Sequence, residues 1–259
     1  MARPFRPTTL AALTAALLLP LASRAEEAAM ATDRPDIVES SAVVGLHRFQ
    51  VETSFASESN KVDGVKTTTR MTPTLLRYGI TENTELRLET DGFLRDGQDH
   101  GFSDVSLGLK WHTHDGDDAT GKPAIAWLFH ADLDSGSQAF RGHGVRPSVR
   151  MVAEWELPHD LSLGIMPGVL RDTNDDGRHF VAGIFAVTLG KSWTDDFRTF
   201  VEVAGQQLTS TKNGGAVVTY DAGMAYMLSP TMQIDTAVSI GANHHTPDRL
   251  WTVGFSVKF

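Results

Sequence analysis

Charged side chains recur at every second position along several stretches of this 259-residue chain. Arg87 and Glu89 alternate with leucines, and Arg150 and Glu154 alternate with valine, methionine and alanine. Alternate residues of an extended strand share one face, so these ions line up opposite an apolar face. On an inward-facing wall they could pair across a narrow lumen and contact a passing solute. The residues expected to line such a lumen are Glu52, Arg87, Glu89, Asp104, Lys110, Arg150, Glu154, Arg198, Glu202, Asp221 and Asp235.

Two other patterns suggest metal binding but lack ligands. Asp172–Gly177 follows the first half of a calcium-binding EF-hand loop, but Gly183 stands where the twelfth position needs a bidentate glutamate. His112 and His114 share a face if their strand continues, with no third ligand fixed nearby. Cysteine is absent, which excludes thiolate metal sites and thiol nucleophiles. We therefore expect no metal and no cofactor.

Hydrolytic chemistry would need a serine, a histidine and an acid brought together in space. Serine and histidine are common here, but the chain contains no G-x-S-x-G nucleophile elbow and singles out no Ser–His pair. We therefore do not expect an enzyme. A barrel enzyme that modifies outer-membrane lipid stays open as a minor alternative.

The alternating residues belong to strands, and the last nine residues show this most clearly. Trp251, Val253, Phe255, Val257 and Phe259 share one parity, with polar or small residues between them. The same pattern along the chain gives about twelve strands of about 10–13 residues. Strands of this number and length predict an all-β fold, an antiparallel transmembrane β-barrel of the outer-membrane type. A periplasmic β-sandwich or jelly roll is the alternative.

The connections between the expected strands alternate in length, as in outer-membrane barrels with short periplasmic turns and longer outer loops. The tight turns are 80–84, 158–160, 194–196 and 229–231, and the longer links are 57–65, 94–101, 134–145, 172–179, 209–215 and 243–248. The link 112–122 is long where a short turn is expected.

Residues 1–25 match a secretory signal peptide. Arg3 and Arg6 precede an apolar run, and small residues at 23 and 25 offer a cleavage site. Removing these residues takes away three arginines and no acids, so the net charge changes from −9 to −12. Such an acidic chain lacks the basic footprint that nucleic acid requires. We expect residues 26–45 to form a periplasmic or lumen-plugging segment and residues 46–259 to form the barrel.

Asp33, Arg34, Pro35 and Asp36 precede the first expected strand. In one interpretation this segment folds into the lumen as a plug, and Arg34 pairs with a carboxylate such as Glu89, Asp104 or Glu154. In the other, it is a periplasmic turn with solvated charges. A buried ion pair has to offset its own desolvation, so the sequence leaves both interpretations open.

Several short segments also occur together in one known family. They are Thr32–Ser40 (TDRPDIVES), Arg77–Thr81, Gly101–Lys110, Tyr220–Gly223 and Gly254–Phe259. Together they resemble the outer-membrane family named after the meta-cleavage pathway of phenol degradation, across nearly all of residues 32–259. The resemblance implies a barrel channel in a Gram-negative outer membrane and uptake of aromatic or other hydrophobic compounds. It carries no catalytic residues. The chain departs from the family pattern at 133–136, where Leu-Asp-Ser-Gly replaces a frequent Pro-Thr-Gly.

The C-terminus carries a further resemblance. A last strand with Trp251 and Phe255 that ends on Phe259 resembles the signal by which barrel-assembly machinery recognises outer-membrane proteins. That machinery, the lipid bilayer and lipopolysaccharide are therefore the expected partners, together with a small hydrophobic or aromatic solute.

These observations predict an exported, porin-like outer-membrane transporter through which small, hydrophobic or aromatic solutes pass passively. The lumen side chains and the N-terminal segment would set the bore. A lateral route through the barrel wall is equally compatible with the sequence. A closed structural barrel with loop-mediated contacts remains the alternative function.

Overall fold

The computed structural model describes residues 29–62, 64–174 and 176–259. The expected signal peptide, residues 1–25, lies outside the described residues. Among the described residues, no helix is long and apolar enough to cross a membrane.

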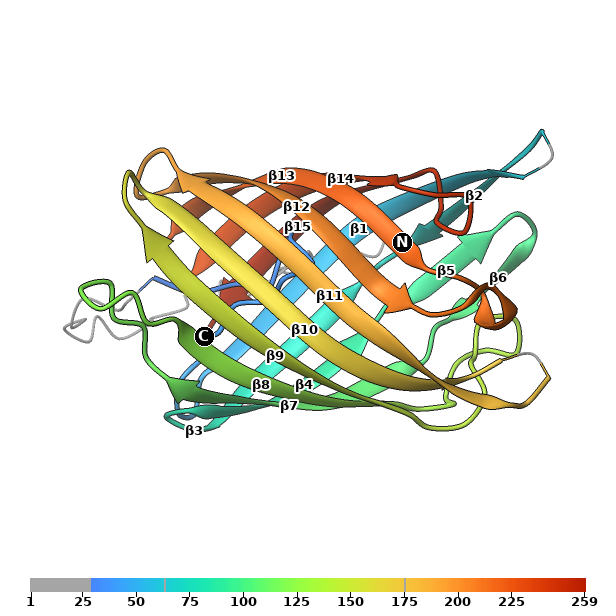
Figure 1. The fold of residues 1–259 in the computed structure, drawn as a ribbon, viewed down its shortest axis with the longest axis horizontal. Helices are drawn as coiled ribbons and strands as arrows, with labels where there is room; N and C mark the ends of the chain where they lie inside the picture. The colour runs from blue at the N-terminus through green and yellow to red at the C-terminus, as the bar shows by residue number, and fades with distance from the viewer. Residues whose placement is uncertain (1–28, 63, 175) are drawn as a thin grey trace, which may run out of the picture.

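The described residues form one antiparallel sheet that closes on itself (Figure 1). In chain order its strands are β1 (Phe49–Val62), β2 (Val65–Met71), β3 (Thr74–Thr81), β4 (Thr84–Thr90), β5 (Phe93–Asp96), β6 (Asp99–Phe102), β7 (Val105–His114), β8 (Ala124–Asp132), β9 (Arg146–Leu157), β10 (Leu161–Thr173), β11 (His179–Ser192), β12 (Phe197–Leu208), β13 (Val217–Ser229), β14 (Met232–Gly241) and β15 (Arg249–Lys258). A 3₁₀ turn, η1 (Thr211–Asn213), lies between β12 and β13.

Within the described residues, these segments make twelve spans. β2 with β3, β4 with β5, and β6 with β7 each form one span with a two-residue interruption. Pairing of β15 with β1, from Gln50 opposite Lys258 to Ser59 opposite Arg249, closes the barrel. The predicted antiparallel barrel of about twelve strands is therefore confirmed.

The two outer links predicted at 57–65 and 94–101 are wrong, because both are largely strand. β1 and β2 stay paired as far as Lys61 opposite Lys66, and β5 and β6 form a second hairpin. Threonine and valine at the start of β2 favour extended backbone despite the polar neighbours that suggested a loop. Gly64 and Gly97, with φ of 83° and 58°, supply the left-handed conformation that the two tight turns require.

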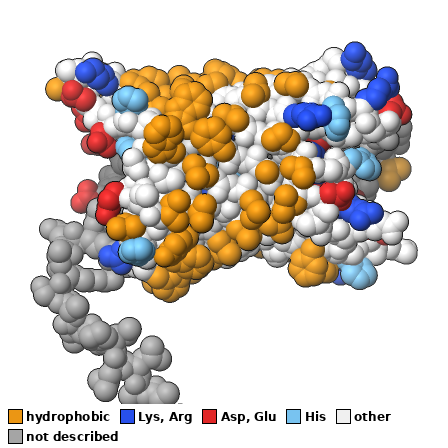
Figure 2. Space-filling view, turned by 90° about the horizontal axis from the view of Figure 1, so that it is seen from below, with side chains coloured by type: hydrophobic (Ala, Val, Ile, Leu, Met, Phe, Trp, Pro, Cys, Tyr) orange, Lys and Arg blue, Asp and Glu red, His pale blue; other side chains and the backbone are white. Residues whose placement is uncertain are grey.

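On the face shown in Figure 2, outward-facing hydrophobic side chains cover the middle of the barrel as an apolar band, and charged side chains gather at its two ends. Several aromatic residues of this band lie toward the end that carries the short turns, where Trp111 of β7 pairs directly with Trp127 of β8. Both rings are exposed, as are Tyr78 and Tyr226. Such a belt fits the interface between membrane and water.

The inward-facing side chains divide into a charged side and an apolar side. Buried ions and amides project from β1, β3, β4, β7, β13 and β14, whereas β8 to β12 contribute a buried apolar cluster together with His130 and Glu202. The wall residues of that cluster are Leu128, Val152, Met166, Ile184, Ala186 and Ala204. On this side of the barrel, apolar residues therefore face the lumen as well as the exterior.

Candidate functional site: the plugged lumen

The N-terminal segment, residues 30–44, lies inside the barrel, and we call it the plug. It enters beside the β13–β14 turn, where the Met30 N–H donates to the Pro230 carbonyl at 2.9 Å. It ends against β3 and β4, where the Val44 N–H donates to Glu85 at 2.9 Å. Between these points it makes hydrogen bonds or ion pairs with inward-facing side chains of seven spans, through β1, β3, β4, β7, β9, β12 and β14.

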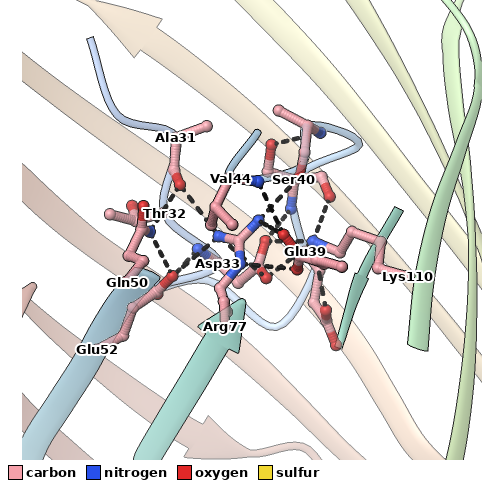
Figure 3. Close-up of polar contacts among 12 residues, drawn as sticks. Ala31, Thr32, Asp33, Glu39, Ser40, Val44, Gln50, Glu52, Arg77 and Lys110 are labelled. Atoms are coloured by element: carbon pink, nitrogen blue, oxygen red, sulfur yellow. Dashed lines mark hydrogen bonds and ion pairs between the residues drawn. The ribbon is translucent and has the colours of Figure 1, made fainter. Parts of the chain in front are cut away.

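Asp33 is the electrostatic centre of the plug (Figure 3). Its two carboxylate oxygens accept from Lys110 Nζ at 2.7 and 2.8 Å, and one of them also accepts from Arg87. Arg77 Nη1 lies 3.4 Å from the same carboxylate. Three cations from β3, β4 and β7 therefore converge on one plug residue.

Glu39 forms a second buried contact with the charged wall. Arg87 Nη2 lies 2.8 Å from one of its oxygens, and Arg150 Nη1 donates to the other at 3.0 Å. Because Arg87 contacts both Asp33 and Glu39, it holds these two parts of the plug at one point on β4.

Asp33 and Glu39 remain ionised despite their burial. Burial alone would raise the pKa of Asp33, but the charges of Arg77, Lys110 and Arg87 together hold that pKa well below its usual range. Burial likewise opposes ionisation of Glu39, and Arg87 leads the cations that lower its pKa on balance. The negative charge that pairs with the wall is thus present at neutral pH.

The wall holds the plug mainly by its backbone. Glu202 accepts from the N–H groups of Ile37 and Val38 at 2.8 Å each, and Glu52 accepts from the Asp33 N–H at 2.9 Å. Glu154 and Glu85 do the same at Ser41 and Val44. Charge-assisted bonds of this kind are stronger than neutral ones.

Cationic side chains of the wall also bind the plug backbone, by donating to its carbonyl groups. Arg77 donates to the carbonyls of Ala31 and Ala42, at 3.0 and 2.9 Å. Lys110 donates to the Ser40 carbonyl at 2.8 Å. The wall therefore satisfies the buried donors and acceptors of an irregular segment that has no sheet partner.

Val38 anchors the other side of the plug. It is 4 % exposed and packs within the apolar cluster of β8 to β12, with Ile37 against it. The plug thus lies between an ionic wall and an apolar wall, with groups that match each.

Arg34 has a different partner from the three predicted. Its Nη2 lies 3.5 Å from Asp235 on β14, and not beside Glu89, Asp104 or Glu154. Of these, Glu154 is taken by a plug N–H. Pro35 follows Arg34, and Asp36 pairs with Arg198 at 3.2 Å.

The predicted lining residues face inward and fall into two groups, one that contacts the plug and one that lines a cavity. Glu52, Arg87, Lys110, Arg150, Glu154, Arg198, Glu202 and Asp235 contact the plug. Glu89, Asp104 and Asp221 instead line a cavity on the outer side of the plug. Asp104 binds an outer loop, and Asp221 accepts from Thr219 at 2.8 Å. The C-terminal residues Trp251 and Phe259 face outward, and Phe255 shares their parity.

Sequence reasoning missed Gln50, Arg77, Glu85 and His112 as plug contacts. Gln50 donates to Ala31, and His112 Nδ1 lies 2.9 Å from the Ser41 carbonyl oxygen. Parity could have identified Arg77, since it alternates with the outward-facing Leu76 and Tyr78. Within the described residues, no group of three or more metal-ligating side chains is placed to hold a metal.

The cavity, of about 910 Å³, is floored by plug residues 33–37 and 39. We call it the outer cavity. Acids outnumber bases on its lining, and no cation lies within ion-pair distance of Asp91, Asp132 or Asp221 among the described contacts. Glu89 lies 3.6 Å from His130, whose two ring nitrogens have no hydrogen-bond partner.

A closed twelve-span barrel with a polar interior places the protein among porin-type β-barrels. The chain is similar to the solved KdgM porin in complex with disordered oligogalacturonate, at 10 % identity and a TM-score of 0.54, covering 81 % of this chain and 99 % of that one. It is also similar to the NanC porin, at 12 % identity and a TM-score of 0.55, covering 82 % and 100 %. At these identities the likeness shows the fold alone.

The family described as "Putative MetA-pathway of phenol degradation" matches residues 32–259. The chain belongs to this family, which confirms the resemblance carried by its sequence segments. No curated protein matches the chain.

Proposed function

We propose that the protein is an outer-membrane channel for passive passage of small solutes, with aromatic compounds among them. The outer cavity carries this proposal, because a closed barrel with a polar interior space of about 910 Å³ can admit a small solute. Family membership supports the aromatic class. The short-turn end with its aromatic belt would face the periplasm, and the end that opens the cavity would face outward.

The plug is the proposed gate of this channel. It forms the floor of the outer cavity, so a solute that moves straight along the axis has to displace it. Its retention depends on wall ions that bind the plug backbone, which allows release without unfolding of the barrel. The signal peptide, the assembly machinery that reads Phe259 and the lipopolysaccharide contacts belong to the same proposal.

Uptake of labelled phenol tests the function directly. Cells that lack the protein are compared with the same cells complemented with it. We expect faster uptake on complementation, and a return to the low rate when the outer loops are blocked. Equal rates would overturn the aromatic assignment.

A second candidate function is a closed structural barrel, favoured by the plug that fills the inner half of the lumen. Bilayer current distinguishes the two, with Glu202→Gln as a variant that loosens the plug and Glu156→Gln, on the exposed end of β9, as its control. A channel conducts more when the plug is loosened. A structural barrel stays silent in both variants.

A further inference from the structure

The outer part of the barrel wall contains one place where a loop stands in for a strand. β8 ends at Asp132, which pairs with Ser106 of β7 and Arg146 of β9. Beyond that level, β6 pairs with β5 alone among the described strands. The loop 133–145 fills the space between β6 and β9, and we call this place the seam.

The three interrupted spans lie side by side and lead to the seam. Their breaks are Thr72–Pro73, Asp91–Gly92 and Ser103–Asp104. The Thr72 N–H donates to the Asp91 carbonyl at 3.0 Å, and the Ser103 N–H donates to the Gly92 carbonyl at 2.9 Å. By contrast, β10 and β11 pair without a break from Leu161 to Thr173. Among the described strands, the three two-residue breaks therefore lie together on one side of the barrel, whereas β11 to β14 carry only local register shifts.

Side chains replace the missing sheet ladder at the seam. Ser135 Oγ accepts from the Val105 N–H at 3.0 Å, and Ser137 Oγ accepts from the Phe102 N–H at 2.9 Å. Two backbone bonds accompany them, from the Leu133 N–H to the Val105 carbonyl at 2.9 Å and from the Ser137 N–H to the Phe102 carbonyl at 2.8 Å.

One carboxylate holds the loop against the wall. Asp104 accepts from the N–H groups of Ser135, Gly136 and Gly142 at 3.1, 2.8 and 2.8 Å. It also accepts from Arg146 Nη2 at 2.7 Å, which fixes the far end of the loop. Loss of this single group would remove the principal attachment of the loop to the wall.

The seam separates the outer cavity from the apolar exterior. Loop residues 139–143 and the break residues Ser103 and Asp104 line the cavity. On the outer surface, Phe102 and Val145 are 62 % and 61 % exposed, and Leu107 and Phe129 are exposed below them. The break thus lies between outward apolar side chains of β6 and β7.

We propose that the seam is a side exit, through which a small aromatic solute leaves the outer cavity for the membrane, with Asp104 as its latch. This inference rests on the proposed function and adds the route. An aromatic solute that takes the seam does not have to displace the plug and its ion pairs. Ions have no such path and depend on displacement of the plug.

A reversible cross-link tests the exit in this cysteine-free chain. A Cβ added to Gly101 would lie 2.5 Å from Ser137 Cβ, so Gly101→Cys with Ser137→Cys can form a disulfide after an outward shift of about 1 Å. We expect oxidation to reduce toluene uptake by complemented cells at least fivefold, and reduction to restore it. Ionic current should not change with the redox state.

Unchanged toluene uptake in the oxidised variant would overturn the exit and leave the proposed function standing. Absence of uptake by the unmodified protein would instead overturn the proposed function. The latch variant Asp104→Ala should raise toluene uptake, whereas Asp134→Ala, which removes contacts within the loop, should not.

A second measurement does not need a solute. A fluorophore is attached at Ser106→Cys beside the seam or, as a control, at Ala237→Cys on β14, and both positions line the outer cavity. Lipids that carry a quencher in their acyl chains should quench the first probe more than the second, and Asp104→Ala should widen the difference. Equal quenching at both positions, unchanged by Asp104→Ala, would contradict the exit.

Discussion

The inner and outer halves of the lumen share one alternating pattern of charge but differ in how the charges are satisfied. In the inner half, Arg77, Arg87 and Lys110 converge on Asp33, and wall carboxylates bind plug N–H groups. In the outer half, Asp91 and Asp132 face a cavity without a cation partner, beside interrupted strands and a loop. Inward-facing charges therefore hold the plug in the inner half of the lumen and line the open outer cavity in the outer half.

The largest expected effect comes from removing an inner cation. Arg77→Met leaves Glu52 as a buried charge without a cation partner and Glu85 with Arg87 alone, which should lower the free energy of unfolding by about 3–5 kcal/mol. Denaturant titration in detergent micelles measures this change in the free energy of unfolding. Arg178→Met, which removes an exposed ion pair in an outer loop, is the control and should have no measurable effect. A similar loss of unfolding free energy in both variants would contradict the view that buried ion pairs stabilise the inner half of the lumen more than exposed pairs stabilise the outer end.

A smaller effect is expected at the backbone clasp of β12. In Glu202→Gln only one oxygen is left to accept, so the bonds to Ile37 and Val38 cannot both persist. We expect plug docking to weaken by about 2 kcal/mol. The rate of proteolytic cleavage within the plug reports this, and Glu156→Gln should leave that rate unchanged. A cleavage rate equal to that of the parent protein would mean that Glu202 does not hold the plug.

The apolar anchor should contribute somewhat less. Val38→Ala removes two buried methyl groups, worth about 1.5 kcal/mol of plug docking. The same cleavage assay applies, with the outward-facing and 67 % exposed Val181→Ala as its control. Equal cleavage rates in the two valine variants would show that packing of Val38 against β8 to β12 does not stabilise plug docking.

In the outer half, removing a charge should alter selectivity and leave docking intact. Asp132→Asn takes one negative charge from the cavity, and we expect the preference for cations over anions to fall by roughly a factor of two. Reversal potentials across a salt gradient measure this in the Glu202→Gln background. An equal change on Asp117→Asn, in the short-end link away from the cavity, would contradict the account.

Mild acid should have the smallest effect on the gate. A carboxylate whose pKa is lower in the docked state stabilises docking when the pH is above its ordinary pKa of about 4. This stabilisation is lost as the pH falls through the pKa of the docked state. Asp33 and Glu39 both have lowered pKa values, so their contribution to plug docking should not change between pH 7 and pH 5. Plug cleavage that accelerates at pH 5 to the same extent in Glu202→Gln as in the parent protein would contradict this.

The sequence predicted the barrel because alternation, strand number and loop length are local properties that repeat along the chain. It also placed Arg87, Lys110 and Glu202 on the inward parity. It failed for Arg34, whose partner Asp235 lies 201 residues away, since nothing local selects one carboxylate among many. It also missed the apolar inner wall, because β10 and β11 carry small or apolar residues on both parities and give no alternation to read.

The central claim, that the plug gates the lumen, can be tested by locking it in place. A Cβ added to Gly164 would lie 3.8 Å from Val38 Cβ, a separation typical of a disulfide. In the Val38→Cys, Gly164→Cys variant, single-channel current should be absent under oxidising conditions and appear on reduction, while each single-cysteine variant ignores the redox state. Equal current in the oxidised and reduced double variant would contradict the account.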